Sequence, residues 1–235
     1  MCRSSSSRAL RHNGAATGGL VVAGMRKGDL RVYLLLESLQ PQFAAYLGTP
    51  TRARGYPAFA GQHALIIEVA PGLMIERVID LALKADPDLE PGILFVERQF
   101  GILEIHGNDK TAIEQAGQAI LAGLGLNADD QLAAKILYTD VIEDIADQHA
   151  VIINRNRQAS MVLPGETLLI VEMVPALYAA IAANVAEKIA PDLTLVDVQM
   201  IGAAGRLYMS GTTAEVKKGL AGIEQVLASI KGRDG

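Results

Sequence analysis

Histidine and cysteine, the residues that most often bind metals or act as nucleophiles, are few and scattered in this chain of 235 residues. The sequence holds one cysteine, Cys2, so neither an internal disulfide nor a thiolate metal site can form. No two of the histidines have the spacing of metal ligands; they are His12, His63, His106 and His149. We therefore interpret each histidine as a solvated or loop residue, and we expect no metal and no cofactor.

The familiar motifs of enzymatic chemistry are also missing. The sequence contains no nucleophile elbow, no P-loop and no dinucleotide fingerprint. Residues 202–205 read GAAG, but they fall between two predicted strands, not at the strand-to-helix turn where phosphates bind. Asp86, Asp88, Asp129 and Asp130 lie in predicted loops or a linker, where solvated turns are their usual place. We predict that the protein is not an enzyme.

Two charged segments remain as candidates for a binding site. Residues 154–157 read NRNR, a small basic cluster that could bind an anion, line a subunit edge or belong to a solvated loop. Glu97 and Arg98 are adjacent opposite charges at the predicted tip of a hairpin between two apolar strands. Such a pair is usually only solvated, so its meaning depends on the elements that position it.

Those elements come from a duplicated segment. Shifted by 104 places, residues 61–108 align with residues 165–212 without a gap, and 14 of the 48 positions are identical. An internal repeat of this length indicates two copies of one domain. We assign the first copy to residues 29–126 and the second to residues 127–235, and we expect residues 1–28 to be a disordered tail.

Each copy carries the same predicted order of elements, β–β–α–β–β–α. The predicted strands are 31–37, 64–69, 93–97 and 102–105 in the first copy, and 135–140, 168–173, 195–201 and 207–209 in the second. Apolar residues spaced three and four apart predict a helix after each second strand and another at the end of each copy. We expect a loop between the first two strands and place Gly101 and Gly205 in the hairpin turns. This order predicts an α+β sandwich in each copy.

Charge and hydropathy exclude further classes of function. The formal net charge is −5, which gives no electrostatic reason to bind nucleic acid or an anionic membrane surface. No apolar run reaches the ~20 residues needed to cross a bilayer. The single cysteine is typical of a reducing cytoplasm. Residues 18–24 resemble a signal peptide only weakly, and Met25 stays open as an alternative start of translation.

The two copies diverge sharply at one loop while matching around it. The counterparts of Glu97 and Arg98, 104 places further on, are Ile201 and Gly202. Divergence at a single loop suggests that this loop does a different job in each copy.

Several segments together resemble the shell domain of bacterial microcompartments. They are 37–48 (ESLQPQFAAYLG), 69–73 (VAPGL), 80–85 (DLALKA) and 96–101 (VERQFG) in the first copy, and 151–155, 187–188 and 201–208 in the second. The order of elements resembles a circularly permuted form, in which the strand that normally closes the domain comes first. Two permuted copies in one chain resemble the tandem shell proteins of carboxysomes and related microcompartments, which implies two ferredoxin-like sandwich domains.

This resemblance implies a structural protein in the shell of a cytoplasmic microcompartment. Members form homotrimers that act as pseudo-hexameric tiles, meet shell hexamers and pentamers, and often stack as two trimers. In such proteins a Glu–Arg pair gates a central pore through which small metabolites pass, and here that pair is Glu97 and Arg98. Ile201, Gly202 and Ala203 of the second copy should approach the same axis.

Lys84 and Lys188 match the family's lysine at the tile edge, although ordinary solvated helix lysines remain an alternative. A second interpretation of the whole chain is a small-molecule-binding regulatory module of duplicated α+β domains. That alternative predicts a ligand cleft between the two copies.

Overall fold

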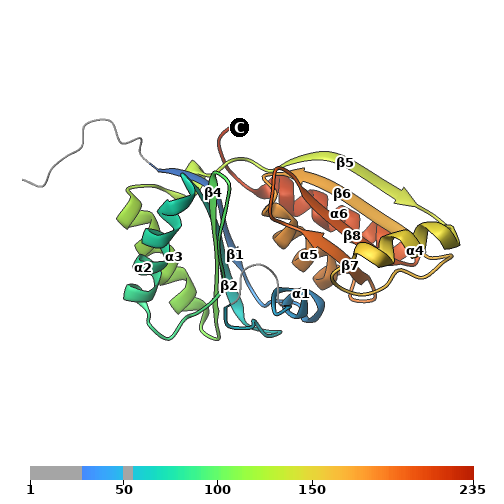
Figure 1. Cartoon of the computed structure of the whole chain (residues 1–235), viewed down its shortest axis with the longest axis horizontal. Helices are drawn as coiled ribbons and strands as arrows, with labels where there is room; N and C mark the ends of the chain where they lie inside the picture. Colours follow the sequence, from blue (N-terminus) through green and yellow to red (C-terminus); the bar gives the residue numbers. More distant parts are fainter. Residues whose placement is uncertain (1–27, 50–54) are drawn as a thin grey trace, which may run out of the picture.

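Two antiparallel four-stranded sheets, each with a pair of helices on one face, make up the computed structural model, which describes residues 28–49 and 55–235 (Figure 1). The strand order is β1-β2-β4-β3 in the first sheet and β5-β6-β8-β7 in the second. The first sheet contains β1 (Asp29–Leu36), β2 (His63–Ala70), β3 (Glu90–Glu97) and β4 (Phe100–Gly107). The second contains β5 (Lys135–Ile142), β6 (Thr167–Val174), β7 (Thr194–Gln199) and β8 (Gly205–Gly211). The tail predicted at residues 1–28 lies, except for Gly28, outside the described residues.

The helix pairs follow the predicted repeat. They are α2 (Ile75–Ala85) and α3 (Lys110–Leu124) on the first sheet, and α5 (Tyr178–Ile189) and α6 (Thr213–Ser229) on the second. A 3₁₀ turn, η1 (Gly72–Met74), comes directly before α2. A second 3₁₀ turn, η2 (Ala128–Asp130), lies between α3 and β5. In α2 the apolar stripe of Ile75, Val78 and Ala82 is buried, as its spacing predicts.

The register of the two sheets confirms the duplication. His63 pairs with Gly107 across β2 and β4, and Thr167 pairs with Gly211 across β6 and β8, so both partners shift by 104. The first strands instead differ by 106, because Asp29 lies opposite Ala70 and Lys135 opposite Val174. We call residues related by these shifts counterparts. The shift is 106 residues from β1 to the end of the helix that follows it, and 104 residues from β2 onward.

The loop predicted between the first two strands of each copy is wrong, because both loops contain a helix. These helices are α1 (Pro41–Leu47) and α4 (Asp147–Asn156). Their entries match: Ser38 and Asp144 are counterparts, and both have left-handed backbone, with φ of 57° and 51°. Helices this short gain most of their stability from tertiary packing, so their own periodicity predicts them poorly.

The hairpin turns also differ from prediction. The strand predicted at 195–201 ends at Gln199, which leaves a loop at 200–204. Gly101 and Gly205 lie inside β4 and β8, not in the turns. A Cβ on Gly101 would come within 2.1 Å of the Gly72 carbonyl oxygen, and one on Gly205 within 2.2 Å of the Ala176 oxygen. These glycines therefore allow close backbone approach.

One apolar core runs across both copies. The face of the first sheet opposite α2 and α3 packs with α1 against the second copy, where α5 lies between the sheets (Figure 1). A separate core fills the space between the first sheet and its own α2 and α3. Because the first of these cores is shared, the fold holds the two copies in one fixed arrangement.

Candidate functional site

The structure brings the predicted pore residues of both copies together. Glu97 and Arg98 line one depression with Ile201, Gly202 and Ala203. Its volume is about 490 Å³, and its remaining lining residues are Gln99, Phe100, Gln199, Ala204 and Arg206. The two hairpins therefore meet on one side of the chain although they are about one hundred residues apart in sequence.

The tip of the first hairpin is tight and exposed. Glu97 pairs with Phe100 in the ladder, so only residues 98–99 form the turn. Arg98 has left-handed backbone with φ of 51°, and its side chain is 90% exposed. Its Nε lies 3.8 Å from Oε1 of Glu97, a loose contact of a kind that stabilises a fold little. A non-glycine residue in this backbone region is strained, and such strain tends to occur at functional loops.

Below the tip, each copy carries a glutamate–arginine pair on its sheet. Nε of Arg31 lies 2.6 Å from Oε1 of Glu68, and Nε of Arg206 lies 2.9 Å from Oε1 of Glu172. The two glutamates are counterparts, but the arginines come from different strands. Burial raises the pKa of Glu68, and the hydrogen bond from Arg31 works in the opposite direction.

These pairs brace the two hairpins. The Arg31 guanidinium lies 3.8 Å from the centre of the Phe100 ring, next to the first turn. Arg206 also donates a hydrogen bond of 3.2 Å to Gln199, the last residue of β7. The sequence signal for this second layer is the identity of Glu68 and Glu172 at equivalent positions of the repeat.

The predicted edge lysines lie away from the two hairpins. Lys84 and Lys188 occupy the last turns of α2 and α5, and both are exposed. Nζ of Lys84 lies 2.6 Å from Oδ2 of Asp80, one turn earlier in the same helix. Neither lysine belongs to the depression.

The interpretation of every histidine as solvated or in a loop is wrong for His106. This side chain is fully buried in β4, and its Nδ1 lies 3.0 Å from Oε1 of the equally buried Glu104. Burial raises the pKa of Glu104, and the hydrogen bond with His106 offsets part of that effect. His149 lies in α4, not in a loop, and is exposed. His12 lies outside the described residues.

The basic cluster at 154–157 forms the end of α4 and has a structural contact. The Asn154 amide donates to the Val162 carbonyl at 2.8 Å and accepts from the Val162 N–H at 3.0 Å. Arg157 donates to the Asn154 carbonyl at 2.9 Å. These bonds tie the following loop to the helix.

A buried polar contact between the copies was missed by sequence reasoning. The Glu187 carboxylate on α5 accepts the backbone N–H groups of Gln42, at 2.8 Å, and Phe43, at 3.0 Å, in the first turn of α1. Asn184 accepts the N–H of Gln40 at 2.8 Å. The Gln42 side chain donates to the carbonyl of Leu193 and accepts from the N–H of Leu195. We call these bonds the α5–α1 clamp.

Carboxylate acceptors at a helix N-terminus satisfy N–H groups that lack partners within the helix and interact favourably with its dipole. The α5–α1 clamp thus holds α1 in place, and α1 has no side-chain cap at its own N-cap residue, Gln40. At the rim of this contact a groove of about 330 Å³ remains between α1 and residues 158–160. The rest of the cleft that the regulatory alternative predicted is occupied by packed apolar side chains.

Within residues 28–49 and 55–235, no group of three or more His, Cys, Asp or Glu side chains is arranged to hold a metal ion. In the same part of the chain, no helix is both long and apolar enough to span a bilayer. The arrangement offers two duplicated sheet units, a charged hairpin and a facing small-residue loop. These features define a tandem α+β protein of the microcompartment shell class.

Comparisons with known proteins agree with this class. Residues 30–130 match the family model described as the CsoS1D N-terminal domain. The carboxysome shell protein CcmP of Synechococcus elongatus is 39% identical over 206 residues, which cover 88% of this chain and 95% of that protein. CsoS1D of Hydrogenovibrio crunogenus is 39% identical over 203 residues, covering 86% of this chain and 97% of that protein. The chain belongs to this family of microcompartment shell proteins.

A solved structure of the "double ringed trimeric shell protein MSM0271 from the RMM microcompartment" is 60% identical, with a TM-score of 0.85. It covers 88% of this chain, and this chain covers all of it. The "fused permuted hexameric shell protein MSM0275" from the same microcompartment is 47% identical, with a TM-score of 0.83 and the same coverage. The predicted fold class, with its tandem permuted shell domains, is confirmed.

Proposed function

We propose that three copies of this chain close into a ring that forms one tile of a microcompartment shell, with a gated pore for small metabolites on its axis. The observation that carries this proposal is the meeting of both predicted pore loops in one depression. A ring of three chains would contain six sheet units, which suits a position among hexameric tiles.

The exposed apolar residues of the single chain support ring closure. Leu73 is 75% exposed, whereas its counterpart Leu177 is fully buried between the copies. Ile152 is 58% exposed, whereas its counterpart Tyr46 is 6% exposed. If the contact between copies repeats from chain to chain, both exposed residues become buried, and a repeated head-to-tail contact closes into a ring. The trimeric state named for MSM0271 agrees with this closure.

Gating would use the pair that only the first copy carries. Three Glu97 and three Arg98 side chains around one axis relieve like-charge repulsion by pairing across chains, and this pairing narrows the pore. When the tips swing outward, the pore widens, and the remaining ring of charge selects permeants by sign. Gly202 and Ala203 leave space for that movement, with nothing within 4 Å of a Cβ built on Gly202.

Single substitutions test the gate. Glu97→Ala and Arg98→Ala should each preserve the ring mass in light scattering but remove the closed class from electron cryo-microscopy images. Glu224→Ala, an exposed acid on α6, is the matched control and should behave like the wild type. A closed pore in both gate variants contradicts the gating role. A monomeric wild-type protein contradicts the ring itself.

The edge and stacking roles are separate proposals. Lys84 and Lys188, exposed at the ends of equivalent helices, would face neighbouring tiles, including shell hexamers and pentamers. The double substitution to alanine should abolish two-dimensional sheets in negative stain while the ring mass stays constant; undiminished sheets contradict this role. The double ring named for MSM0271 supports stacking of two rings, which would give six chains by light scattering.

A further inference from the structure

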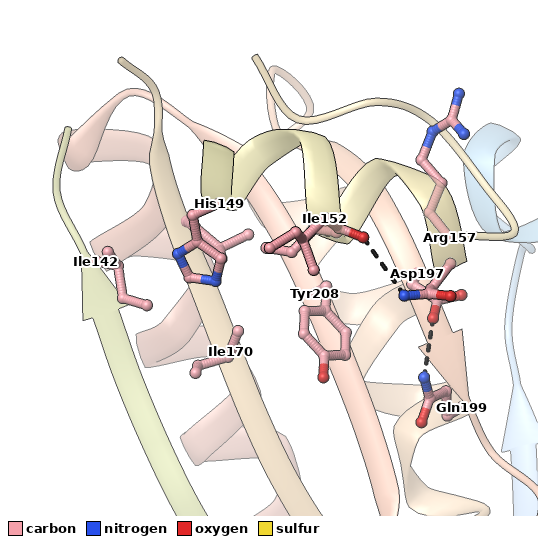
Figure 2. Close-up of a pocket in the computed structure, with 11 residues that line it drawn as sticks. Ile142, His149, Ile152, Arg157, Ile170, Asp197, Gln199 and Tyr208 are labelled. Carbon is pink, nitrogen blue, oxygen red and sulfur yellow. Dashed lines mark hydrogen bonds between the residues drawn. The ribbon is translucent and has the colours of Figure 1, made fainter. Parts of the chain in front are cut away.

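Helix α4 packs on the second sheet through Ala150 and Ile153, but its N-terminal part leaves an open pocket over the sheet. A pocket of about 480 Å³ lies between α4 and the second sheet (Figure 2). His149 and Ile152 reach down from the helix toward Ile170 and Tyr208 on the strands below. The N-cap residue of α4, Ala146, gives the helix no side-chain cap.

The first copy shows what this surface accepts. Its counterpart helix, α1, is held by the α5–α1 clamp, and the residues in the places of His149 and Ile152 are Phe43 and Tyr46, both buried. The helix that fills the contact is α5, whose counterpart in the first copy is α2. The occupant indicated for the α4 surface is therefore α2 of a second copy of this chain.

We infer that Asp80 on α2 caps helix α4 of the adjacent chain in the ring. Asp80 is the counterpart of Asn184, whose side-chain oxygen accepts the N–H of Gln40. The counterpart of Gln40 is Ala146, the N-cap residue of α4. This inference rests on the proposed ring and names the contact that closes it.

The chemistry of the residues suits this exchange. A carboxylate is at least as good an N-cap acceptor as an amide, and the helix dipole favours its negative charge. In the single chain Asp80 is more than half exposed, and its ion-pair partner is Lys84, on the same helix. Gln148, the counterpart of Gln42, is exposed and able to donate to the Leu89 carbonyl, the counterpart of Leu193.

The contact between chains would differ from the contact within the chain. Leu83 replaces Glu187, so one buried acceptor of the α5–α1 clamp has no equivalent. On the sheet, Tyr138 and Asp140 are exposed where Val32 and Leu34 are buried. The chain-to-chain contact is thus the more polar and the weaker of the two, and Asp80 is its principal cap.

Cross-linking tests the location. In a Cys2→Ser background, Gln148→Cys with Leu83→Cys places thiols at the counterparts of Gln42 and Glu187. A short bismaleimide should then join chains into covalent species that stop at three. Gln148→Cys with Glu224→Cys is the control and should give no such ladder. A trimer by light scattering that never cross-links overturns this contact but leaves the ring; a monomer overturns both.

Substitution tests the role of Asp80 itself. Asp80→Asn keeps an acceptor, as Asn184 does, so the ring's dissociation on dilution should stay within about twofold of the wild type. Asp80→Ala removes the acceptor and should weaken each chain-to-chain contact by about tenfold. Light scattering measures the dissociation of the rings on dilution. If Asp80→Ala and wild-type rings dissociate equally, the capping role is overturned.

Discussion

Removing the Glu187 carboxylate should release α1 without unfolding the rest of the chain. Glu187 is 4% exposed and accepts two backbone N–H groups of α1, at 2.8 and 3.0 Å. A hydrogen bond to a charged group stabilises a protein by about 1.5 kcal/mol or more. For Glu187→Ala, both bonds are lost, and the free energy of opening α1 should fall by about 3 kcal/mol. Glu187→Gln keeps an acceptor and should cost about half as much.

Hydrogen exchange measures this local opening directly. The amides of Ala44 and Gly48 are bonded within α1, to the carbonyls of Gln40 and Ala44. A loss of about 3 kcal/mol corresponds to roughly hundredfold faster exchange, because every 1.4 kcal/mol is a factor of ten. Amides in α6 should be unchanged, and Glu224→Ala serves as the control variant. If Ala44 and Gly48 exchange less than about threefold faster in Glu187→Ala, the α5–α1 clamp does not hold α1.

Three further outcomes follow from the structure. Gly205→Ala should lower the unfolding free energy by about 2 kcal/mol in urea, because its Cβ would lie 2.2 Å from a backbone oxygen; Gly48→Ala, whose Cβ would have 3.6 Å, should be near neutral. Burial raises the pKa of Glu104 in the folded state, so the folded chain binds this proton more tightly than the unfolded chain, and the contribution of Glu104 to stability falls as pH rises above about 4.3. Glu104→Gln should flatten that decline in unfolding titrations at successive pH values; an unchanged slope contradicts the assignment. Leu73→Asp should give a monomer in light scattering that still unfolds cooperatively, because Leu73 is exposed in the single chain.

Much of the fold was predictable because each element occurs in both copies of the repeat, so its sequence pattern can be checked twice. The strand at 64–69 lies within β2 and its copy at 168–173 within β6, each extending one residue further at both ends. The helix after the second strand of the first copy was predicted correctly because its buried stripe faces its own sheet. In these cases the periodicity in the sequence reports the packing partner.

The helices α1 and α4 were not predictable in this way. The first turn of α1 is held by side chains that lie about 144 residues further along the chain. No local pattern in the sequence therefore predicts this helix. His106 was misread for a related reason: its burial depends on Glu104, which alternation places on the same face of β4. Gly101 and Gly205 were predicted to lie in turns, since the close approach of η1 to β4, or of Ala176 to β8, is not visible in sequence.

The two loops that we propose to line a pore stand out in the sequence because duplicated copies can be compared with each other. Where Glu68 and Glu172 stay identical, the copies share a bracing task, and both carry an arginine on the sheet. At the hairpin tips, Ile201 and Gly202 take the places of Glu97 and Arg98, so the two tips do not share one role. Such a comparison does not reveal the α5–α1 clamp, because Glu187 and its counterpart Leu83 differ without any motif to give the difference meaning.

The proposed ring gives a physical reason why only the first copy carries the charged tip. In a ring of six identical domains, six Glu–Arg pairs would crowd one axis, and like charges would lie close together whichever way the side chains turned. In the proposed ring, three pairs would alternate with small-residue loops, so each Arg98 would pair with Glu97 of a neighbouring chain and have space beside Gly202, where nothing lies within 4 Å of a built Cβ. On the same proposal, the contact within the chain buries Val32 and Leu34 beside the α5–α1 clamp, whereas the contact between chains would meet the exposed Tyr138 and Asp140. A ring built in this way can loosen at three equivalent places while each chain keeps its own core.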